Sequence, residues 1–543
     1  MHQPGCRPRV GGGGARLTVL QEYVTRQAER RPDAAAIRFG AETVTYAGLD
    51  EASNRLAQLL GALGRERGDR VPLLMPKSPL AITGMIGVLK ADCAYTPVDL
   101  KNPAARVTKV LESLQPRVVL ASEPARALVT ALCAAGALGR SGAPAVVWLE
   151  RGPPPAAFPV AATLDDLLAQ SAAPPPVAGR NGLTDVAHIL FTSGSTGTPK
   201  GVMITHANVM HFVEWALRYF GMTPTDRVSG HSPLHFDLST FDVYGAFAAG
   251  ATLYPVAPEL NLLPHKVAEL IRSAELTQWF SVPSILLHMA KTDAVRPRDF
   301  PALRRLLWCG EAFPTPGVMH WMQRLPHVTF TNLYGPTEAT IASSYYRVPS
   351  CPTDEREPVP IGRACDGEEL LVLDAALQPV SAGAIGDLYI RGVGLSPGYW
   401  RDAERTAAAF LGRDGDRIYK TGDLARVDEA GRIVLVGRSD FQIKSRGYRI
   451  ELGEIESALH TIDGLRECAV VGVETGGFEG TMLGCAYVPQ PGIAVTTAAL
   501  RRRLAERLPS YMIPSRWRCL ERLPLNANGK VDRGALRELL RVS

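Results

Sequence analysis

The sequence predicts an α/β protein, with a large N-terminal domain of layered sheets and helices and a small α+β C-terminal domain. From about Leu17, short runs rich in β-forming residues alternate with helical stretches, a pattern typical of parallel sheets covered by helices. The 543 residues are also too many for one hydrophobic core, so at least two domains are expected. A change of pattern near residues 437–440 marks the boundary between them.

The individual elements follow from local periodicity and turn residues. In the N-terminal domain we expect a helix over 17–30, strands over 35–39 and 42–46, a helix over 47–65, a strand over 70–74, a helix over 80–89 and a hairpin over 422–436. The Pro-, Ala- and Gly-rich stretch 140–176 is expected to be a loose surface excursion. After the boundary we expect a helix over 452–459, strands over 467–473 and 484–488, and a helix over 497–508. The predicted domains are therefore 17–439 and 440–543.

Composition excludes several classes of protein. The net charge is only +5, and no long Lys/Arg block is present, so nucleic-acid binding is not expected. No run of about 18 apolar residues occurs, and residues 1–16 lack the apolar segment of a signal peptide. We expect a disordered tail there and no membrane span. Nine scattered cysteines without a Cys-x-x-Cys pair argue against a disulfide framework or structural zinc, and favour the cytoplasm.

The most informative segment is LFTSGSTGTPKG at 190–201, which follows an apolar run. Glycines allow backbone N–H groups to approach phosphate oxygens, hydroxyls donate further hydrogen bonds, and Lys200 adds a positive charge. The spacing is not that of a Walker A loop. The candidate phosphate-binding residues are Thr192, Ser193, Gly194, Ser195, Thr196 and Lys200.

Three further segments offer groups for a nucleotide site. In NLYGPTE at 332–338, Tyr334 could stack on a purine and Glu338 could hold Mg²⁺, although Tyr-Gly-Pro taken alone favours a simple β-turn. Asp423, after a predicted strand, suits ribose hydroxyls or could be a turn cap. Lys530 lies on a turn near the C-terminus, where it could also be a plain surface lysine.

Together these segments resemble the AMP-forming adenylating superfamily, which includes acyl- and aryl-CoA synthetases and luciferase. Within it, the closest resemblance is to the amino-acid-activating adenylation domains of nonribosomal peptide synthesis. The resemblance covers residues 17–537 and extends to the segments 89–99, 386–392, 398–400, 437–451 and 508–514.

The resemblance implies ATP and Mg²⁺ as cofactors, and a reaction in which an amino-acid carboxylate attacks the α-phosphate to form an aminoacyl-AMP. The implied roles are phosphate binding for the 192–200 loop, Mg²⁺ binding for Glu338, contact with the α-phosphate for Thr337, adenine stacking for Tyr334 and ribose binding for Asp423. Lys530 would bond the substrate carboxylate and the bridging oxygen. Other implied nucleotide-site residues are Gly310, Glu311, Ala312, Asn332, Gly335 and Arg438.

A second step is implied as well. Asp440 matches the hinge position, so the C-terminal domain is expected to be mobile: its rotation would withdraw Lys530 and bring Gly447 to the site, forming a tunnel for a thiol. That thiol would be the phosphopantetheine arm of a carrier protein. Because only residues 531–543 follow Lys530, a freestanding enzyme acting on a carrier protein in trans is expected.

The substrate is expected to be an amino acid, since Asp237 matches the carboxylate that pairs with the substrate ammonium; a turn or helix cap is the alternative. The other implied wall positions are Leu238, Phe241, Phe280 or Ser281, Leu307, Cys309, Leu333, Ile341 and Ala342. None is charged, which favours a small or compact apolar side chain such as L-proline or an alanine-like residue. A β-amino acid, or an acyl- or aryl-CoA ligase activity, remains the alternative.

Overall fold

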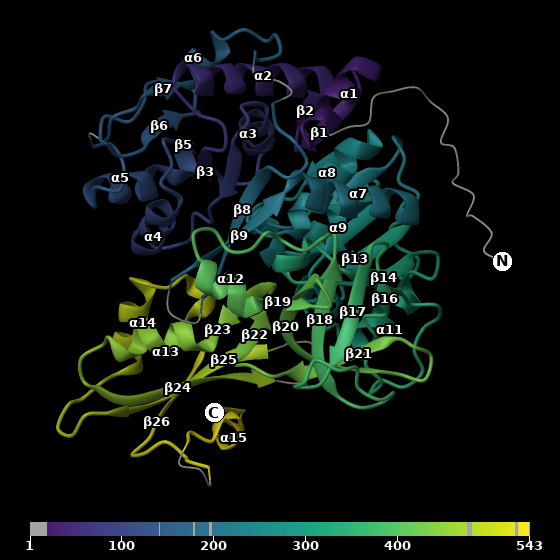
Figure 1. Cartoon of the computed structure of the whole chain (residues 1–543), viewed down its shortest axis with the longest axis vertical. Helices are drawn as coiled ribbons and strands as arrows, with labels where there is room; N and C mark the ends of the chain where they lie inside the picture. The colour runs from purple at the N-terminus through teal and green to yellow at the C-terminus, as the bar shows by residue number, and fades with distance from the viewer. Residues whose placement is uncertain are drawn as a thin grey trace.

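The computed structural model describes residues 19–140, 142–176, 180–194, 198–474, 481–526 and 530–541 (Figure 1). The expected tail over 1–16 lies outside these ranges, as do Ser195 and Thr196. Within them, three sheets and their helices form the large domain, and two smaller sheets form the C-terminal domain.

The first sheet of the large domain has seven strands in the order β7-β6-β5-β3-β4-β8-β9. These are β3 (Arg70–Leu74), β4 (Ala94–Pro97), β5 (Val118–Ala121), β6 (Ala145–Trp148), β7 (Ala162–Thr163), β8 (Val186–Thr192) and β9 (Lys200–Thr205). Its helices are α2 (Tyr46–Ala62), α3 (Pro79–Lys90), α4 (Ala104–Leu114), α5 (Arg126–Ala134) and α6 (Leu164–Leu168). Neighbouring strands are parallel except β8 and β9, which form an antiparallel hairpin in which Thr192 lies opposite Lys200.

The expectation of a loose excursion over 140–176 is wrong in part. Strand β6 lies inside this stretch and pairs in parallel with β5, while β7 and α6 follow it. Val146, Val147 and Trp148 are fully buried. Burying such side chains outweighs the turn-forming tendency of the Pro and Gly residues around them, so the segment joins the sheet.

The second sheet has nine strands in the order β16-β15-β14-β13-β12-β10-β11-β1-β2. They are β1 (Ala35–Phe39), β2 (Glu42–Thr45), β10 (Arg227–Gly230), β11 (Thr252–Pro255), β12 (Gln278–Ser281), β13 (Arg305–Trp308), β14 (Thr329–Tyr334), β15 (Ser344–Arg347) and β16 (Arg363–Ala364). Its helices are α1 (Glu22–Arg30), α7 (His206–Phe220), α8 (Leu238–Ala249), α9 (Pro264–Ser273), α10 (Pro283–Lys291) and α11 (Thr315–Arg324). Strands β10 and β12–β14 run parallel, so the loops after them meet at one edge.

A third sheet of the large domain leads to the domain boundary. It contains β17 (Glu368–Leu373), β18 (Gly386–Gly392), β19 (Phe410–Arg413), β20 (Asp416–Val427) and β21 (Ile433–Arg438), with α12 (Ala403–Ala409). Strands β20 and β21 form the expected antiparallel hairpin, whose turn is fastened by Asp428 accepting hydrogen bonds from the N–H groups of Ala430 and Arg432.

The C-terminal domain is an α+β unit with its own core. It comprises the hairpin β22 (Gln442–Ser445) and β23 (Tyr448–Glu451), the sheet of β24 (Leu465–Glu474), β25 (Thr481–Pro489) and β26 (Arg516–Cys519), and helices α13 (Leu452–His460), α14 (Thr497–Ala505) and α15 (Arg533–Arg541). Its apolar side chains pack on one another in clusters separate from those of the large domain. Figure 1 shows the unit lying against one end of the large domain.

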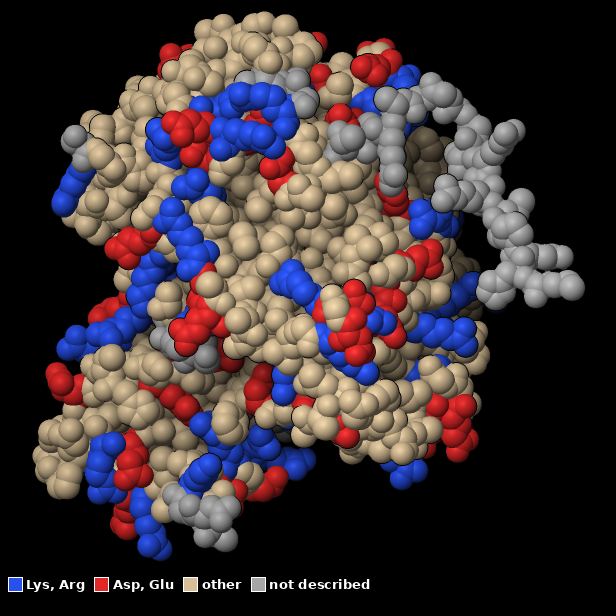
Figure 2. Space-filling view, in the orientation of Figure 1, with Lys and Arg blue, Asp and Glu red and all other residues tan. Residues whose placement is uncertain are grey.

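Charged side chains of both signs are interspersed over the face shown in Figure 2, without a broad area of one sign. In the described part of the chain, no helix combines the length and the apolar character needed to traverse a bilayer.

Candidate active site

A cleft between the two domains is lined by ten of the predicted site residues. The loops after β8, β12, β13 and β14 of the large domain form one side, and the β22–β23 hairpin of the small domain forms the other. Among its lining residues are Thr192, Ser193, Asp237, Leu238, Gly310, Gly335, Thr337, Asp423, Arg438 and Gly447. Segments far apart in the sequence are thus brought to one place.

Tyr334, Asp423 and Arg438 form a hydrogen-bonded group in which Asp423 and Arg438 line the cleft and Tyr334 is buried beside them. The Tyr334 hydroxyl donates to Oδ2 of Asp423 at 2.5 Å, and Nη1 of Arg438 donates to Oδ1 of the same carboxylate at 2.5 Å. Arg438 also pairs with Asp440 at 2.7 Å, which links the site to the predicted hinge. Gly422, just before Asp423, has φ of +77° and no space for a side chain against Arg438 and Asp440. A carboxylate held in this way can accept hydrogen bonds from hydroxyl groups of a sugar.

Glu338 is completely buried and has three partners. Oε1 accepts from the Tyr399 hydroxyl at 2.8 Å and from Lys200 Nζ at 3.1 Å, while Oε2 accepts from Arg449 Nη1 at 2.6 Å. Burial alone would raise the pKa of Glu338, but the charges of Arg449 and Lys200 hold it well below its ordinary value. Glu338 is therefore an ionised carboxylate in a dry environment.

An ionised, buried carboxylate suits Mg²⁺, which is usually bound by one or two carboxylates together with phosphate oxygens. Within the described ranges, no three or more His, Cys, Asp or Glu side chains gather to hold a metal ion. Glu338 is therefore the residue that would hold a Mg²⁺ ion, which would neutralise phosphate charge there.

The phosphate loop contacts the small domain. The Ser193 hydroxyl donates to the carbonyl oxygen of Arg449 at 2.7 Å, and the N–H of Gly194 donates to Oε2 of Glu454 at 3.2 Å. A side chain at position 194 would collide with the carbonyl oxygen of Thr198, so glycine is required for this loop path.

Asp237 lies at the start of α8 with its carboxylate in the cleft. It occupies the N-cap position without a side-chain capping hydrogen bond, although the N–H of Leu238, the first residue of α8, bonds to its carboxylate. Burial raises the pKa of Asp237 to about 6, against the opposing effects of a hydrogen bond from Thr337 and the charge of Lys444. A cation placed beside this carboxylate would relieve the cost of burying its charge.

The predicted side-chain wall forms one packed apolar group behind Asp237. Phe241 and Phe280 meet edge to face, with ring centroids 5.8 Å apart. The wall members, all buried, are Leu238, Phe241, Phe280, Ser281, Leu307, Cys309, Leu333, Ile341 and Ala342. Of these, Leu238 lines the open cleft and the others are packed behind it. Burial, with a further contribution from the charge of Asp237, raises the pKa of the Cys309 thiol to about 12.

Other predicted nucleotide-site residues have different surroundings. Glu311 accepts hydrogen bonds from the N–H groups of Gly447 at 2.6 Å and Ser284 at 3.0 Å. The Asn332 amide donates to the carbonyl oxygen of Pro360 at 2.8 Å, and Ala312 is exposed. The side chain of Asn332 thus supports the loop, and neither it nor Ala312 lines the cleft.

The small domain presents Gly447, and not Lys530, to the cleft. Glycine suits position 447 because the backbone has a φ of +81°, which residues with a side chain rarely adopt. A Cβ there would also be crowded, since it would lie 3.0 Å from Val282. Lys530 is exposed and lies outside the cleft lining. The structure therefore has the orientation that the sequence analysis associates with thiol transfer, and the role of Lys530 in adenylation stays a prediction.

Sequence reasoning missed several charged or polar groups of this site. Arg449, Lys444 and Tyr399 lay within segments that it quoted but were given no role, and Glu454 and Arg106 were not singled out. Lys444 Nζ lies 5.6 Å from the centre of the Tyr334 ring. The available signal was the concentration of charged residues in the segment 444–454, where three basic residues are followed by two acidic ones.

The fold and the site define an ATP-dependent, AMP-forming ligase. Residues 24–400 match the family model of the AMP-binding enzyme, and residues 454–530 match that of the AMP-binding enzyme C-terminal domain. The chain belongs to the AMP-binding enzyme family.

Three similar proteins are informative. An L-proline–[L-prolyl-carrier protein] ligase of Streptomyces coelicolor is 35% identical over 511 residues, covering 91% of each chain. A D-alanine–D-alanyl carrier protein ligase of Staphylococcus epidermidis is 31% identical, covering 96% of this chain and 99% of the relative. In structure, the chain is similar to a holo NRPS protein containing adenylation and PCP domains bound to a vinylsulfonamide inhibitor, with a TM-score of 0.77 and 28% identity over 96% of this chain and 84% of that one.

Proposed function

We propose that the chain activates a compact apolar amino acid, L-proline being the first candidate, and transfers it to the phosphopantetheine thiol of a separate carrier protein. The observation that carries this proposal is Asp237, a buried carboxylate facing the cleft whose raised pKa calls for a cationic partner. The ammonium group of an amino acid supplies that cation, whereas a fatty or aryl acid does not.

The surroundings of Asp237 favour a compact apolar side chain. The wall residues named above are buried, and none of them is charged. A larger or charged side chain would need displacement of well-packed groups or an unpaired buried charge, both of which are costly. The similarity to a prolyl-carrier and a D-alanyl-carrier protein ligase supports substrates of this size.

The proposed chemistry has two steps. An oxygen of the amino-acid carboxylate bonds to the α-phosphorus of ATP, the bond to the β-phosphate oxygen breaks, and pyrophosphate leaves. The sulfur of the carrier thiol then bonds to the acyl carbon, AMP leaves, and the thiol proton is released. Asp237 orients the amine, Asp423 holds the ribose, and Tyr334 holds the adenine, so that positioning supplies much of the rate. Mg²⁺, held by Glu338, would supply neutralisation of the phosphate charges.

An amino-acid-dependent pyrophosphate-exchange panel tests the proposal. Proline, alanine, serine, valine and β-amino acids form one arm, and fatty and aryl acids form the other. We expect exchange with a compact apolar amino acid, followed by thioester formation on a phosphopantetheine-bearing carrier. Exchange with fatty or aryl acids but with no amino acid would refute the proposal.

A further inference from the structure

The small domain contacts Glu338 and the predicted phosphate loop through one positively and one negatively charged side chain. Arg449, on β23, pairs with Glu338 at 2.6 Å, and its carbonyl oxygen accepts from Ser193 at 2.7 Å. Glu454, on α13, accepts from the N–H of Gly194 at 3.2 Å and is itself paired with Arg106 of α4. All of these side chains are largely shielded from solvent, and Glu454 is only 1% exposed.

These contacts use the groups that the proposed function assigns to Mg²⁺ and pyrophosphate. Glu338 is the carboxylate for the metal, and in this orientation a guanidinium occupies its Oε2. The Ser193–Gly194 segment belongs to the loop that is expected to bind phosphate oxygens. In this orientation, a carboxylate oxygen of Glu454 accepts the hydrogen bond from the N–H of Gly194. Each group thus meets a partner of the same sign as the ligand proposed for it.

Neither Gly194 nor Glu338 can bind its small-domain partner and the proposed ligand equally well at the same time. A backbone N–H donates one strong hydrogen bond, so Gly194 cannot serve Glu454 and a phosphate equally well. A divalent cation at Glu338 would stand beside the guanidinium of Arg449, and like charges in a buried site repel strongly. Bound Mg·pyrophosphate and this domain orientation therefore compete.

We propose that Arg449 and Glu454 are positioning residues that stabilise the thiol-transfer orientation by replacing Mg²⁺ and pyrophosphate at Glu338 and Gly194. This inference rests on the proposed two-step function. It explains how the small domain responds to the end of the first step. Glu338 keeps Tyr399 and Lys200 at Oε1 throughout, whereas departure of Mg·pyrophosphate frees Oε2 of Glu338 and the N–H of Gly194, and rotation of the small domain supplies Arg449 and Glu454 to them. The orientation then follows from charge compensation, since burying Arg449 without Glu338 would be costly.

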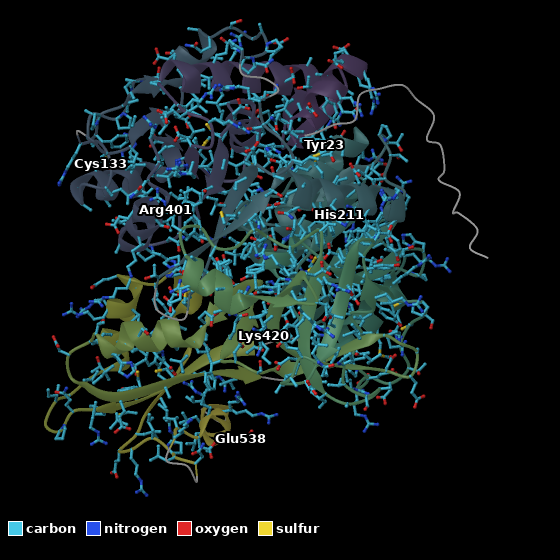
Figure 3. The ribbon with its side chains drawn as sticks, in the orientation of Figure 1. Tyr23, Cys133, His211, Arg401, Lys420 and Glu538 are labelled. Atoms are coloured by element: carbon cyan, nitrogen blue, oxygen red, sulfur yellow. The ribbon has the colours of Figure 1, made fainter. Side chains whose placement is uncertain are left out.

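Binding of a pyrophosphate analogue tests the competition directly. Isothermal titration calorimetry with Mg²⁺ and methylenebisphosphonate needs no amino acid, and is done on the full chain. We expect Arg449→Ala and Glu454→Gln to bind the analogue at least fivefold more tightly than the unaltered protein, because they weaken the competing orientation. Arg541→Ala and Glu538→Gln are the matched controls. They alter an exposed pair on α15, where Figure 3 shows Glu538 on the side of the small domain away from the large one.

A kinetic comparison gives a second readout. Transfer from preformed aminoacyl-AMP to the carrier thiol is expected to lose at least ten times more rate in Arg449→Ala than pyrophosphate exchange loses. Retained exchange also shows that the variant is folded. The proposal is overturned if analogue binding is unchanged in both variants, or if exchange and transfer fall in parallel. Absence of exchange with every amino acid would instead refute the proposed function, while the calorimetric comparison would still decide the competition.

Discussion

Replacing Asp237 by Asn is expected to stabilise the protein while it removes activity. The carboxylate is 8% exposed, and burial raises its pKa from 3.8 to about 6. Keeping this group ionised at neutral pH therefore costs about 3 kcal/mol of folding free energy. Asparagine has nearly the same shape and no charge, so Asp237→Asn should recover up to ~3 kcal/mol in the substrate-free protein.

The sign of the pH dependence is fixed by the direction of the pKa change. A pKa that is higher in the folded state means that the folded protein binds the proton more tightly, so the favourable contribution is complete below pH 3.8 and is lost as the pH rises through about 6. The unaltered protein and Asp237→Asn should thus have similar stability near pH 4, and the gap should open between pH 4 and pH 7.

Activity is expected to change in the opposite direction. Removing one partner of a buried charge pair with the substrate ammonium costs about 2–5 kcal/mol, which lowers kcat/KM between about thirtyfold and several thousandfold. Urea unfolding at pH 4 and pH 8 measures the first effect, and pyrophosphate exchange measures the second. Asp366→Asn, at a side chain that is 73% exposed, is the control. A stability gap that does not depend on pH, or a variant with unchanged kcat/KM, would show that the reasoning about Asp237 is wrong.

Three further substitutions test other parts of the structure. Burial lowers the pKa of His206 to about 4, and its Nδ1 accepts from the N–H of Leu20 at 3.1 Å. The neutral imidazole therefore contributes folding free energy that is fully present above pH 6.5 and falls on acidification, by about 2 kcal/mol at pH 5. Urea unfolding should show this fall in the unaltered protein and not in His206→Asn. Lys530→Ala should lower pyrophosphate exchange at least a hundredfold and thiol transfer from preformed adenylate far less; equal losses would contradict its role in the first step. Asp423→Asn should raise the KM for ATP about tenfold or more with little change in the KM for the amino acid, as initial-rate kinetics can verify.

Local patterns were sufficient for much of the fold. Strand β3 occupies the expected residues 70–74, and the β20–β21 hairpin turns within the expected range 422–436. Helix α1 begins at Glu22 and not at residue 17, since Val19 and Leu20 continue the apolar pattern but are buried ahead of the first helical residue. Strand β6 was missed because four residues between Pro- and Gly-rich stretches give too short a signal, and its burial depends on partners far along the chain.

The candidate site also contains residues that could be predicted from the sequence and a contact that could not. Tyr334, Glu338 and Asp423 could be proposed from sequence because each lies in a short segment whose residue types suit a ligand group, and Asp237 could be proposed because it matches a position of the family that the chain resembles. The pairing of Arg449 with Glu338 could not, because the two residues are 111 positions apart and meet only through the orientation of one domain against another. Such a contact leaves no periodicity in the local sequence.

The thiol buried in the side-chain wall has a consequence for chemical selectivity. An aminoacyl-AMP is an acylating agent, and Cys309 is the one thiol among the proposed wall residues. With a pKa of about 12, only about one Cys309 thiol in ten thousand is a thiolate at pH 8, whereas an ordinary thiol is substantially ionised there. In the proposed reaction, burial therefore makes Cys309 a poor nucleophile towards the aminoacyl-AMP, and a carrier thiol with an ordinary pKa is the better acceptor.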